Sequence, residues 1–473
     1  MSLHQRLTKE IQQGPSGPKI GAFFDLDRTL LAGFSASSFF FERLLSGRMA
    51  PKEVVDSLRG ALSFGLGRTG FSGMMVATAG AYRGLAEKVL LEIGEEVFAK
   101  HLATQIYPES RALVEAHQAM GHTVAIVSSA TRYQAEPLAK EMNIPHVLCT
   151  RLDVEDGVFT GRVVHPTCWG EGKAEAGRQL AGEHDLDLAQ SFFYTDSDED
   201  MPLLEIVGRP RPLNPNRRLA QIAKERHWPV RRFSSRGTPG AEDWARTALA
   251  YASLAPSLGA GLLAGLVSGS RREAINTGGA LFGDLATSLS GVDLRVEGEE
   301  NLWAQRPAVF IFNHQSGLDL ILMAKLVRRD VTGVGKKELL KNPLFGPLLA
   351  AGGVVFVDRF NTARAIEALK PAVQALGDGL SLAIAPEGTR SLTPRLGAFK
   401  KGAFHMAMQA GVPIVPVVFR NVLDALPKNA LVVRPATVQA VVLPPVDTSN
   451  WTVEGLDEEV RAIRDQYLEV LGR

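Results

Sequence analysis

Two aspartates, Asp25 and Asp27, stand one residue apart in the motif DLDRT, directly after the apolar run GAFF. The first carboxylate can attack phosphorus as a nucleophile, because aspartate side chains form covalent aspartyl-phosphates. The second can protonate the leaving oxygen and then activate a water molecule. The pair by itself does not identify this chemistry, since neighbouring carboxylates also cap helices or bind metal ions.

Three more motifs follow in chain order and strengthen this interpretation. Ser128 ends the apolar run TVAIVS and can hydrogen-bond a phosphoryl oxygen, while Lys173 in GEGKAE can neutralise both nucleophile and phosphate. Asp196 and Asp200 in YTDSDED supply the hard oxygen ligands that Mg²⁺ prefers. Because so many carboxylates would repel one another without a cation, the set predicts magnesium-dependent hydrolysis of a phosphomonoester.

A histidine and an aspartate lie five residues apart in NHQSGLD, after the apolar run AVFIF; they are His314 and Asp319. An aspartate one helical turn after a histidine can hold one ring nitrogen by a hydrogen bond. The other nitrogen is then able to take a proton from an attacking hydroxyl group. Most such pairs are structural, so a catalytic role depends on the motifs that accompany this one.

Two further apolar runs in this half of the chain also end in polar residues. FVDRF carries Arg359, and APEGTRS carries Glu387, Gly388, Thr389 and Arg390. Arginine recognises phosphate or carboxylate through paired hydrogen bonds. Its recurrence beside a histidine base indicates an acceptor that bears a phosphate.

Both sets of motifs follow strand-like runs that alternate with helical stretches, which predicts an α/β fold with its sites at the strand ends.

The chain has 473 residues, 45% hydrophobic and 22% charged, as expected for a globular protein of two or more domains. Its 52 basic and 51 acidic residues give no bias towards nucleic acid. Two cysteines cannot form a disulfide framework, which indicates a reducing compartment.

The spacing of these runs also predicts the domain boundaries. The segment between the first two runs is too long for a plain crossover, so we expect an inserted helical cap over about 30–106. The predicted divisions are an α/β domain over 19–233, a linker over 234–246, an apolar two-helix segment over 247–290 and a second α/β domain over 291–473.

Residues 247–269 contain no charged side chain, and about 20 apolar residues are enough to cross a bilayer. A single crossing would separate the two α/β halves, so we expect a helical hairpin or re-entrant pair in one leaflet. A basic stretch over 209–236 would attract anionic headgroups. The first residues lack the apolar core of a secretion signal, so we expect the cytoplasmic face of the cell membrane. The alternative is a buried helical pair in a soluble domain.

The four motifs of the first half resemble the haloacid dehalogenase superfamily, in its phosphoserine-phosphatase-like branch with a helical cap on a Rossmann-like domain. The resemblance implies that Asp25 is the nucleophile and Asp27 the acid and base. It also implies a Mg²⁺ ion held by Asp25, the carbonyl group of Asp27 and Asp196, with Asp200 nearby in the same metal-binding motif.

The motifs NHxxxxD, FVDR, PEGTR and VPIVP resemble the glycerolipid acyltransferases, specifically PlsC-type 1-acylglycerol-3-phosphate enzymes. The resemblance implies that His314, oriented by Asp319, deprotonates the free hydroxyl of lysophosphatidate. That hydroxyl would attack an acyl thioester of coenzyme A or an acyl-carrier protein, with no metal ion. The resemblance also implies that the acceptor's phosphate is bound by Arg359, Glu387, Gly388 and Arg390. The PEGT motif is preceded by Ala385, where the family commonly has an aromatic residue, and this departure affects only the shape of the pocket.

Three interpretations of the fusion stay open. The chain can be a bifunctional membrane-surface enzyme of phospholipid biosynthesis whose phosphatase acts on a lipid phosphate. It can be an acyltransferase with a silent, regulatory phosphatase-like domain, or one joined to a phosphatase for soluble phosphoesters. The intact set of catalytic positions in the first half argues against the silent domain. The sequence leaves the acyl donor and the oligomeric state open.

Overall fold

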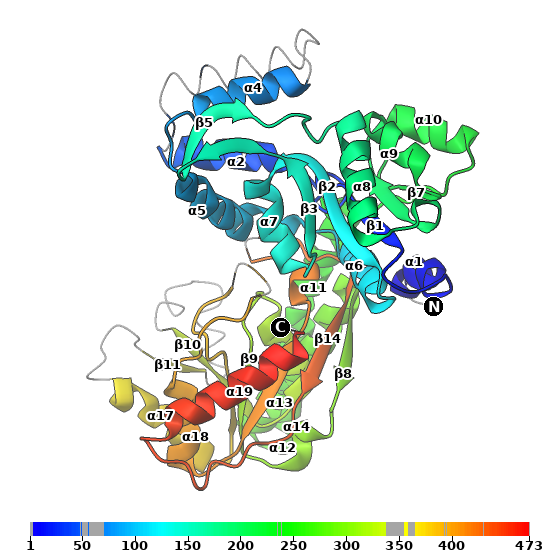
Figure 1. The fold of residues 1–473 in the computed structure, drawn as a ribbon. Helices are drawn as coiled ribbons and strands as arrows, with labels where there is room; N and C mark the ends of the chain where they lie inside the picture. The colour runs from blue at the N-terminus through cyan, green and yellow to red at the C-terminus, as the bar shows by residue number, and fades with distance from the viewer. Residues whose placement is uncertain are drawn as a thin grey trace. The chain divides into compact units, whose positions relative to one another are not determined.

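The computed structural model divides into two compact units, residues 1–238 and 239–473 (Figure 1). The structure describes residues 3–47, 49, 55, 71–233, 235–237, 239–336, 354–357, 365–391, 393, 395–428 and 430–472.

The first unit is a five-stranded parallel sheet with helices on both faces. In spatial order its strands are β3 (His146–Thr150), β2 (Thr123–Thr131), β1 (Gly21–Phe24), β6 (Phe192–Thr195) and β7 (Arg209–Pro212). The helices are α1 (Leu3–Gln12), α6 (Pro108–Ala119), α7 (Arg132–Glu141), α8 (Glu171–His184), α9 (Met201–Ile206) and α10 (Arg217–Glu225), with 3₁₀ turns at Leu188–Gln190 and Asp198–Asp200.

Alternation along β1 explains these layers. Phe24 packs in one buried cluster with α1, α6 and α7, whereas its neighbour Phe23 packs in another with α8, α9 and α10. Hydrophobic runs buried on both faces are typical of parallel sheets covered by helices. The Rossmann-like fold class predicted from the sequence is confirmed.

A cap separates β1 from α6. It contains α2 (Ser35–Leu45), α4 (Phe71–Ala81), α5 (Glu87–Val97), a π-helical turn (Phe98–Leu102) and a 3₁₀ turn (Ala103–Gln105). The described part of this segment is helical, as the sequence predicts.

A β-hairpin that the sequence analysis missed completes the cap. Its strands, β4 (Leu152–Glu155) and β5 (Val158–Val163), pair antiparallel. The hairpin joins the cap helices because the Gly84 amide donates to the Phe159 carbonyl at 2.9 Å and the Tyr82 ring contacts the Phe159 ring. The cap is therefore built from two separate segments of the chain.

The second unit contains a seven-stranded sheet. In spatial order the strands are β11 (Val355–Val357), β10 (Val331–Lys336), β12 (Ser381–Ile384), β9 (Val309–Phe312), β13 (Ile414–Phe419), β14 (Ala436–Val442) and β8 (Val292–Glu297). Strands β13 and β14 pair antiparallel, and the other described pairs are parallel. The helices that accompany this sheet are α14 (Asn301–Ala304), α15 (Asp319–Val327), α17 (Ala365–Gly377), α18 (Gly402–Ala410) and α19 (Leu456–Val470), with a 3₁₀ turn at Val422–Asp424.

The faces of β9 again alternate. Phe310 and Phe312 pack in a cluster with α15, while Val309 and Ile311 pack in a cluster with α17, α18 and α19. This second α/β layer structure agrees with the predicted fold class.

Three helices precede this sheet: α11 (Ala241–Ala252), α12 (Leu254–Ser268) and α13 (Arg271–Ser290). The stretch Ala241–Ser268 has 28 residues, and its most apolar 18 residues have a mean hydropathy of 1.5 and are 22% buried. By length and composition it is apolar enough to cross a membrane. Along α12 the exposed fractions reach 67% at Leu262, 79% at Leu266 and 89% at Val267.

Helix α13 lies between this apolar helix and the rest of the unit, packing against both α12 and α15. Its polar residues bind the α/β layer: Arg272 pairs with Asp330, and Asp284 pairs with Lys325 and Arg328. The hairpin of α12 and α13 is thus held to the unit by charged contacts of α13, and the leucines of α12 are left uncovered.

Close approach of α12 and α13 depends on glycine. A Cβ atom on Gly261 would lie 2.5 Å from the Ala274 carbonyl oxygen, whereas one on Gly259 would meet nothing within 4 Å. We expect Gly261→Leu to lower the free energy of unfolding of the second unit by about 1–3 kcal/mol, as overpacking does. Gly259→Leu is the matched control and should leave it unchanged or raise it, because glycine weakens a helix interior. Thermal unfolding in detergent measures both, and equal effects would contradict the close packing.

Candidate active sites

The first site lies where β1 and β6 end. The Asp25 amide donates to the Tyr194 carbonyl at 2.9 Å, which places the Asp25 side chain at the carboxyl edge of the sheet. From α8, the Lys173 ammonium lies 2.7 Å from Asp25 Oδ1 and 2.8 Å from Asp200 Oδ2. Asp200 Oδ2 also accepts a hydrogen bond from the Thr195 hydroxyl. The structure therefore brings together three of the predicted residues in a buried ionic cluster.

Asp27 is oriented by the first turn of the cap. Its Oδ1 accepts a hydrogen bond from the Ser35 amide at 2.8 Å, and its Oδ2 accepts one from the Ser35 hydroxyl at 3.2 Å. Burial raises the pKa of the Asp27 carboxyl group above its usual value, and the two Ser35 hydrogen bonds oppose that rise. A raised pKa suits a group that has to carry a proton.

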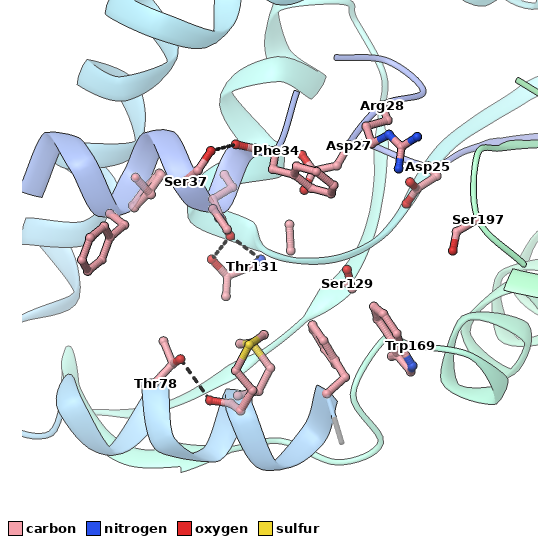
Figure 2. A pocket seen from close by; sticks show the side chains of 18 of the residues that line it. Asp25, Asp27, Arg28, Phe34, Ser37, Thr78, Ser129, Thr131, Trp169 and Ser197 are labelled. Atoms are coloured by element: carbon pink, nitrogen blue, oxygen red, sulfur yellow. Dashed lines mark hydrogen bonds between the residues drawn. The ribbon is translucent and has the colours of Figure 1, made fainter. Parts of the chain in front are cut away.

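Asp196 follows β6 and is paired with a residue that the sequence analysis did not select. The Arg28 guanidinium lies 3.2 Å from Asp196 Oδ2. Arg28 has a φ of 59°, in the left-handed region, and its guanidinium lies 5.8 Å from the centre of the Phe34 ring. Figure 2 shows Arg28 beside Asp25 and Asp27 at one end of the pocket.

Ser128 lies inside β2 and is only 1% exposed; its Oγ accepts a hydrogen bond from the Ala130 amide at 3.2 Å. Its neighbour Ser129 lines the pocket together with Thr131 (Figure 2). Strand β2 continues to Thr131, so Ser128 does not end the strand as the sequence predicts. The role of Ser128 in holding phosphate stays a prediction, and Ser129 is a second hydroxyl group beside it.

The second site lies where β9 ends. His314 Nδ1 is 2.8 Å from Asp319 Oδ2, and that same oxygen accepts hydrogen bonds from the amides of Gln315 and Ser316. The loop therefore wraps around one carboxylate oxygen at the start of α15. Because Nδ1 faces this acceptor, the tautomer favoured for neutral His314 carries its proton on Nδ1. Its Nε2 then carries no proton and can accept one.

Asp319 is 0% exposed, so its negative charge needs compensation. Burial raises the pKa of its carboxyl group. The contact with His314 opposes this rise more than the hydrogen bonds from the Ser316 and Gln315 amides do. Asn313, just before the histidine, fixes the loop by exchanging two hydrogen bonds with the backbone of Phe419 on β13. The dyad is thus anchored to two neighbouring strands.

Glu387 follows β12, the other neighbour of β9. Its Oε1 accepts a hydrogen bond from the His314 amide at 2.8 Å, and its Oε2 accepts one from the Gly397 amide at 2.8 Å. Burial raises the pKa of its carboxyl group, and these two hydrogen bonds oppose the rise. Glu387 therefore positions the backbone of the dyad, while a direct contact with the substrate's phosphate stays a prediction.

Known proteins resemble both units. The family model of haloacid dehalogenase-like hydrolases matches residues 22–205, and that of the acyltransferases matches residues 293–420. A 1-acyl-sn-glycerol-3-phosphate acyltransferase of Limnanthes douglasii is 37% identical over 194 residues, covering 41% of this chain and 68% of that protein. A protein of Mycobacterium tuberculosis named a probable phosphatase is 33% identical over 236 residues, covering 49% of this chain and 82% of that protein.

The chain belongs to both families. A crystal structure of the 1-acyl-sn-glycerophosphate acyltransferase PlsC from Thermotoga maritima is 27% identical, with a TM-score of 0.42, and covers 49% of this chain and 97% of that one. Residues 1–238 contain the segment that matches the hydrolase family and are called the hydrolase unit below, and residues 239–473 contain the segment that matches the acyltransferase family and are called the acyltransferase unit.

The hydrolase unit has an excess of negative charge at its site. The four aspartates of its motifs carry four negative charges when ionised, and Lys173 and Arg28 face them with two positive charges. Burial, aided by neighbouring carboxylates and opposed by Lys173 and Arg28, raises the pKa of Asp25 to about 8 and that of Asp196 to about 6. A divalent cation would neutralise the remaining charge.

Among the described residues, no three acidic, histidine or cysteine side chains enclose a metal position by themselves. Mg²⁺ does not need such a cage, because it keeps several waters and binds through one or two carboxylates plus a substrate phosphate. Asp25 and Asp196 follow the adjacent parallel strands β1 and β6, so the hydrolase unit fits an ion held in this way.

The remaining predicted residues of the acyltransferase unit differ in their surroundings. Gly388 has a φ of 75°, and a Cβ there would lie 3.1 Å from the Lys400 ammonium, so glycine is favoured at this turn. Thr389 is exposed, and the Arg390 guanidinium donates to the Lys428 carbonyl at 3.2 Å. Arg359 lies outside the described residues, so its contact with the acceptor's phosphate stays a prediction.

Proposed function

We propose that this chain is a bifunctional enzyme of phospholipid biosynthesis. The acyltransferase unit transfers an acyl group from a thioester of coenzyme A or acyl-carrier protein to lysophosphatidate, giving phosphatidate. The hydrolase unit cleaves a phosphomonoester. The observation that carries the proposal is the His314–Asp319 dyad at a strand end, in a chain that is 37% identical over 194 residues to a named 1-acyl-sn-glycerol-3-phosphate acyltransferase.

The dyad geometry supports base catalysis. With Nδ1 held by Asp319, Nε2 of His314 takes the proton of the lysophosphatidate hydroxyl as its oxygen attacks the thioester carbonyl. The C–S bond then breaks, and the leaving thiolate takes up the proton from the imidazolium. Asp319 stabilises the imidazolium in between, and Arg359 and Arg390 are proposed to bind the acceptor's phosphate.

In the hydrolase unit, the Asp25 carboxylate attacks phosphorus and the P–O bond to the alcohol breaks as Asp27 protonates the leaving oxygen. Asp27 then deprotonates a water molecule, which attacks the aspartyl-phosphate and releases inorganic phosphate with Asp25 restored. Lys173, 2.7 Å from Asp25, balances the charge of the nucleophile. A Mg²⁺ ion bound by Asp25, the Asp27 carbonyl group and Asp196 would neutralise the phosphoryl oxygens.

We place the acyltransferase unit at the cytoplasmic face of the membrane, with α12 in one leaflet. The uncovered leucines of α12 support this, because a contiguous exposed apolar face marks a membrane or protein contact. The charged contacts of α13 would stay at the protein side of the interface.

Lipid product analysis tests the whole proposal. Full-length protein in vesicles receives lysophosphatidate, an acyl-coenzyme A and Mg²⁺, and the products are separated and identified. We expect phosphatidate, together with inorganic phosphate and the matching monoacylglycerol or diacylglycerol. Absence of phosphatidate would refute the acyltransferase assignment, and phosphatidate without phosphate release would refute a lipid phosphatase.

A further inference from the structure

We propose that the hydrolase unit acts on an amphiphile, a phosphomonoester whose long apolar chain occupies the cavity under the cap. This inference rests on the proposed phosphatase function and adds the substrate class to it. The walls, the volume and the mouth of that cavity each support it.

The cavity has two chemically different ends. Asp25, Asp27 and Lys173 lie at one end, and Figure 2 shows the labelled carboxylates across the pocket from α4, which carries Thr78. The cap contributes a wall of large apolar side chains from α2 and α4: Phe39, Phe40, Phe71, Met74 and Met75.

Loop residues of the Rossmann-like core close the same wall. The Trp169 ring stacks on Phe71 at 4.4 Å between ring centroids, and the Ser72 hydroxyl is 2.8 Å from the Thr167 hydroxyl. Arg43 also lines the cavity, with its guanidinium 4.9 Å from the centre of the Tyr82 ring. A phosphate at the carboxylate end therefore has an aromatic and methionine-lined space beside it.

The volume of the cavity exceeds what a small phosphoester needs. It measures about 770 Å³, towards the upper end of the roughly 300–1,000 Å³ of sites that hold drug-sized ligands. A compact polar ester would leave most of the apolar wall against water. An alkyl chain would bury it, with a gain of about fourfold in affinity for each methylene removed from water.

The mouth of the cavity is apolar as well. Phe34 and Phe41 both line the cavity, yet they are 57% and 58% exposed, so the wall continues to the surface. Leu45, one turn beyond Phe41 on α2, is 83% exposed. Exposed apolar residues grouped at a cavity mouth let a chain pass from a lipid aggregate to the site without crossing water.

Chain-length kinetics on the full chain test the inference. The substrates are glycerol 3-phosphate and monomeric lysophosphatidates of increasing acyl length, with phosphatidate to distinguish one chain from two. We expect kcat/KM for phosphate release to rise up to about fourfold per methylene until the cavity is full. A flat series in the wild type would overturn the proposal.

Matched variants on α4 locate the effect. Met74→Asp puts a charge in the cavity wall, whereas Val76→Asp puts one on the outer, 49% exposed side of the same helix. We expect Met74→Asp to flatten the chain-length series and spare glycerol 3-phosphate, and Val76→Asp to behave as the wild type. Ala77→Trp, which fills the cavity without a charge, should shorten the longest chain accepted. Equal loss on every substrate in both cavity variants would contradict the proposal.

A binding measurement separates this inference from the phosphatase function. Trp169 lines the cavity, so its fluorescence, taken as the difference from Trp169→Phe, reports occupancy without turnover. Long-chain lysophosphatidate should change this signal in Asp25→Asn, and glycerol 3-phosphate should not. If phosphate release is absent from every ester but the Trp169 signal responds, the phosphatase function fails and chain binding stands. No response to the long chain overturns chain binding.

Discussion

Replacing His314 with alanine is expected to lower acyl transfer to lysophosphatidate by about 10²–10⁴-fold, the usual contribution of a positioned general base. The loss follows from geometry, since Nε2 of His314 is the proton acceptor and Nδ1 is held by Asp319 at 2.8 Å. Phosphate release by the hydrolase unit should be unchanged, because its groups belong to a different sheet. Initial rates of phosphatidate formation and phosphate release, measured on the same preparation, provide the comparison.

The matched control is His405→Ala on α18, which removes a half-buried histidine of the same unit that is not part of the dyad. It should retain acyl transfer. Similar losses in the two variants would show that any histidine deletion damages the unit, and loss of both activities in a folded His314→Ala protein would refute independent sites.

The strand ends were the most predictable part of this molecule. The apolar runs GAFF and VFIF form fully buried strands of covered sheets, and the polar residues that follow them lie at the carboxyl edge of each sheet. That rule correctly placed Asp25 and His314 at strand ends and led to the confirmed fold class. The rule works because a parallel strand that is buried on both faces consists of consecutive apolar residues, which can be recognised within a short stretch of sequence.

The hairpin β4–β5 was missed although its signal is local too. Asp156-Gly157 stands between the two strands with φ values of 51° and 76°, as a two-residue hairpin turn requires. The flanking residues alternate only partly between buried and exposed, which weakened the pattern. Its assignment to the cap could not come from sequence, since the contacts with Tyr82 and Gly84 join distant segments.

Partners of the predicted site residues were the least predictable part. The folded positions of the cap turn and the strand ends determine these contacts. They bring Ser35 to Asp27, Arg28 to Asp196 and Thr195 to Asp200. Arg28 stands inside the DLDRT motif, but only its left-handed backbone shows that it turns back to Asp196. Glu387 is a similar case: its residue type indicated a substrate site, and its hydrogen bonds reveal that it holds the dyad loop.

Replacing Asp25 with asparagine is expected to lower phosphate release by more than about 10³-fold and to leave acyl transfer at the wild-type rate. An amide cannot form the aspartyl-phosphate, and loss of a catalytic nucleophile typically removes most of an enzyme's rate enhancement. The fold should survive, because burial already disfavours the Asp25 charge and Lys173 keeps its contact with Asp200 at 2.8 Å. Chelation of Mg²⁺ should reproduce this pattern in the wild type.

Asp185→Asn is the matched control, since it removes a carboxylate whose side chain is 83% exposed in the same unit. Its phosphate release should equal that of the wild type, measured with lysophosphatidate and with a small phosphoester. If Asp25→Asn released phosphate as fast as Asp185→Asn, Asp25 would be ruled out as the nucleophile. If chelation instead stopped acyl transfer, a metal ion would be needed at the His314 site, and the dyad alone would not account for its chemistry.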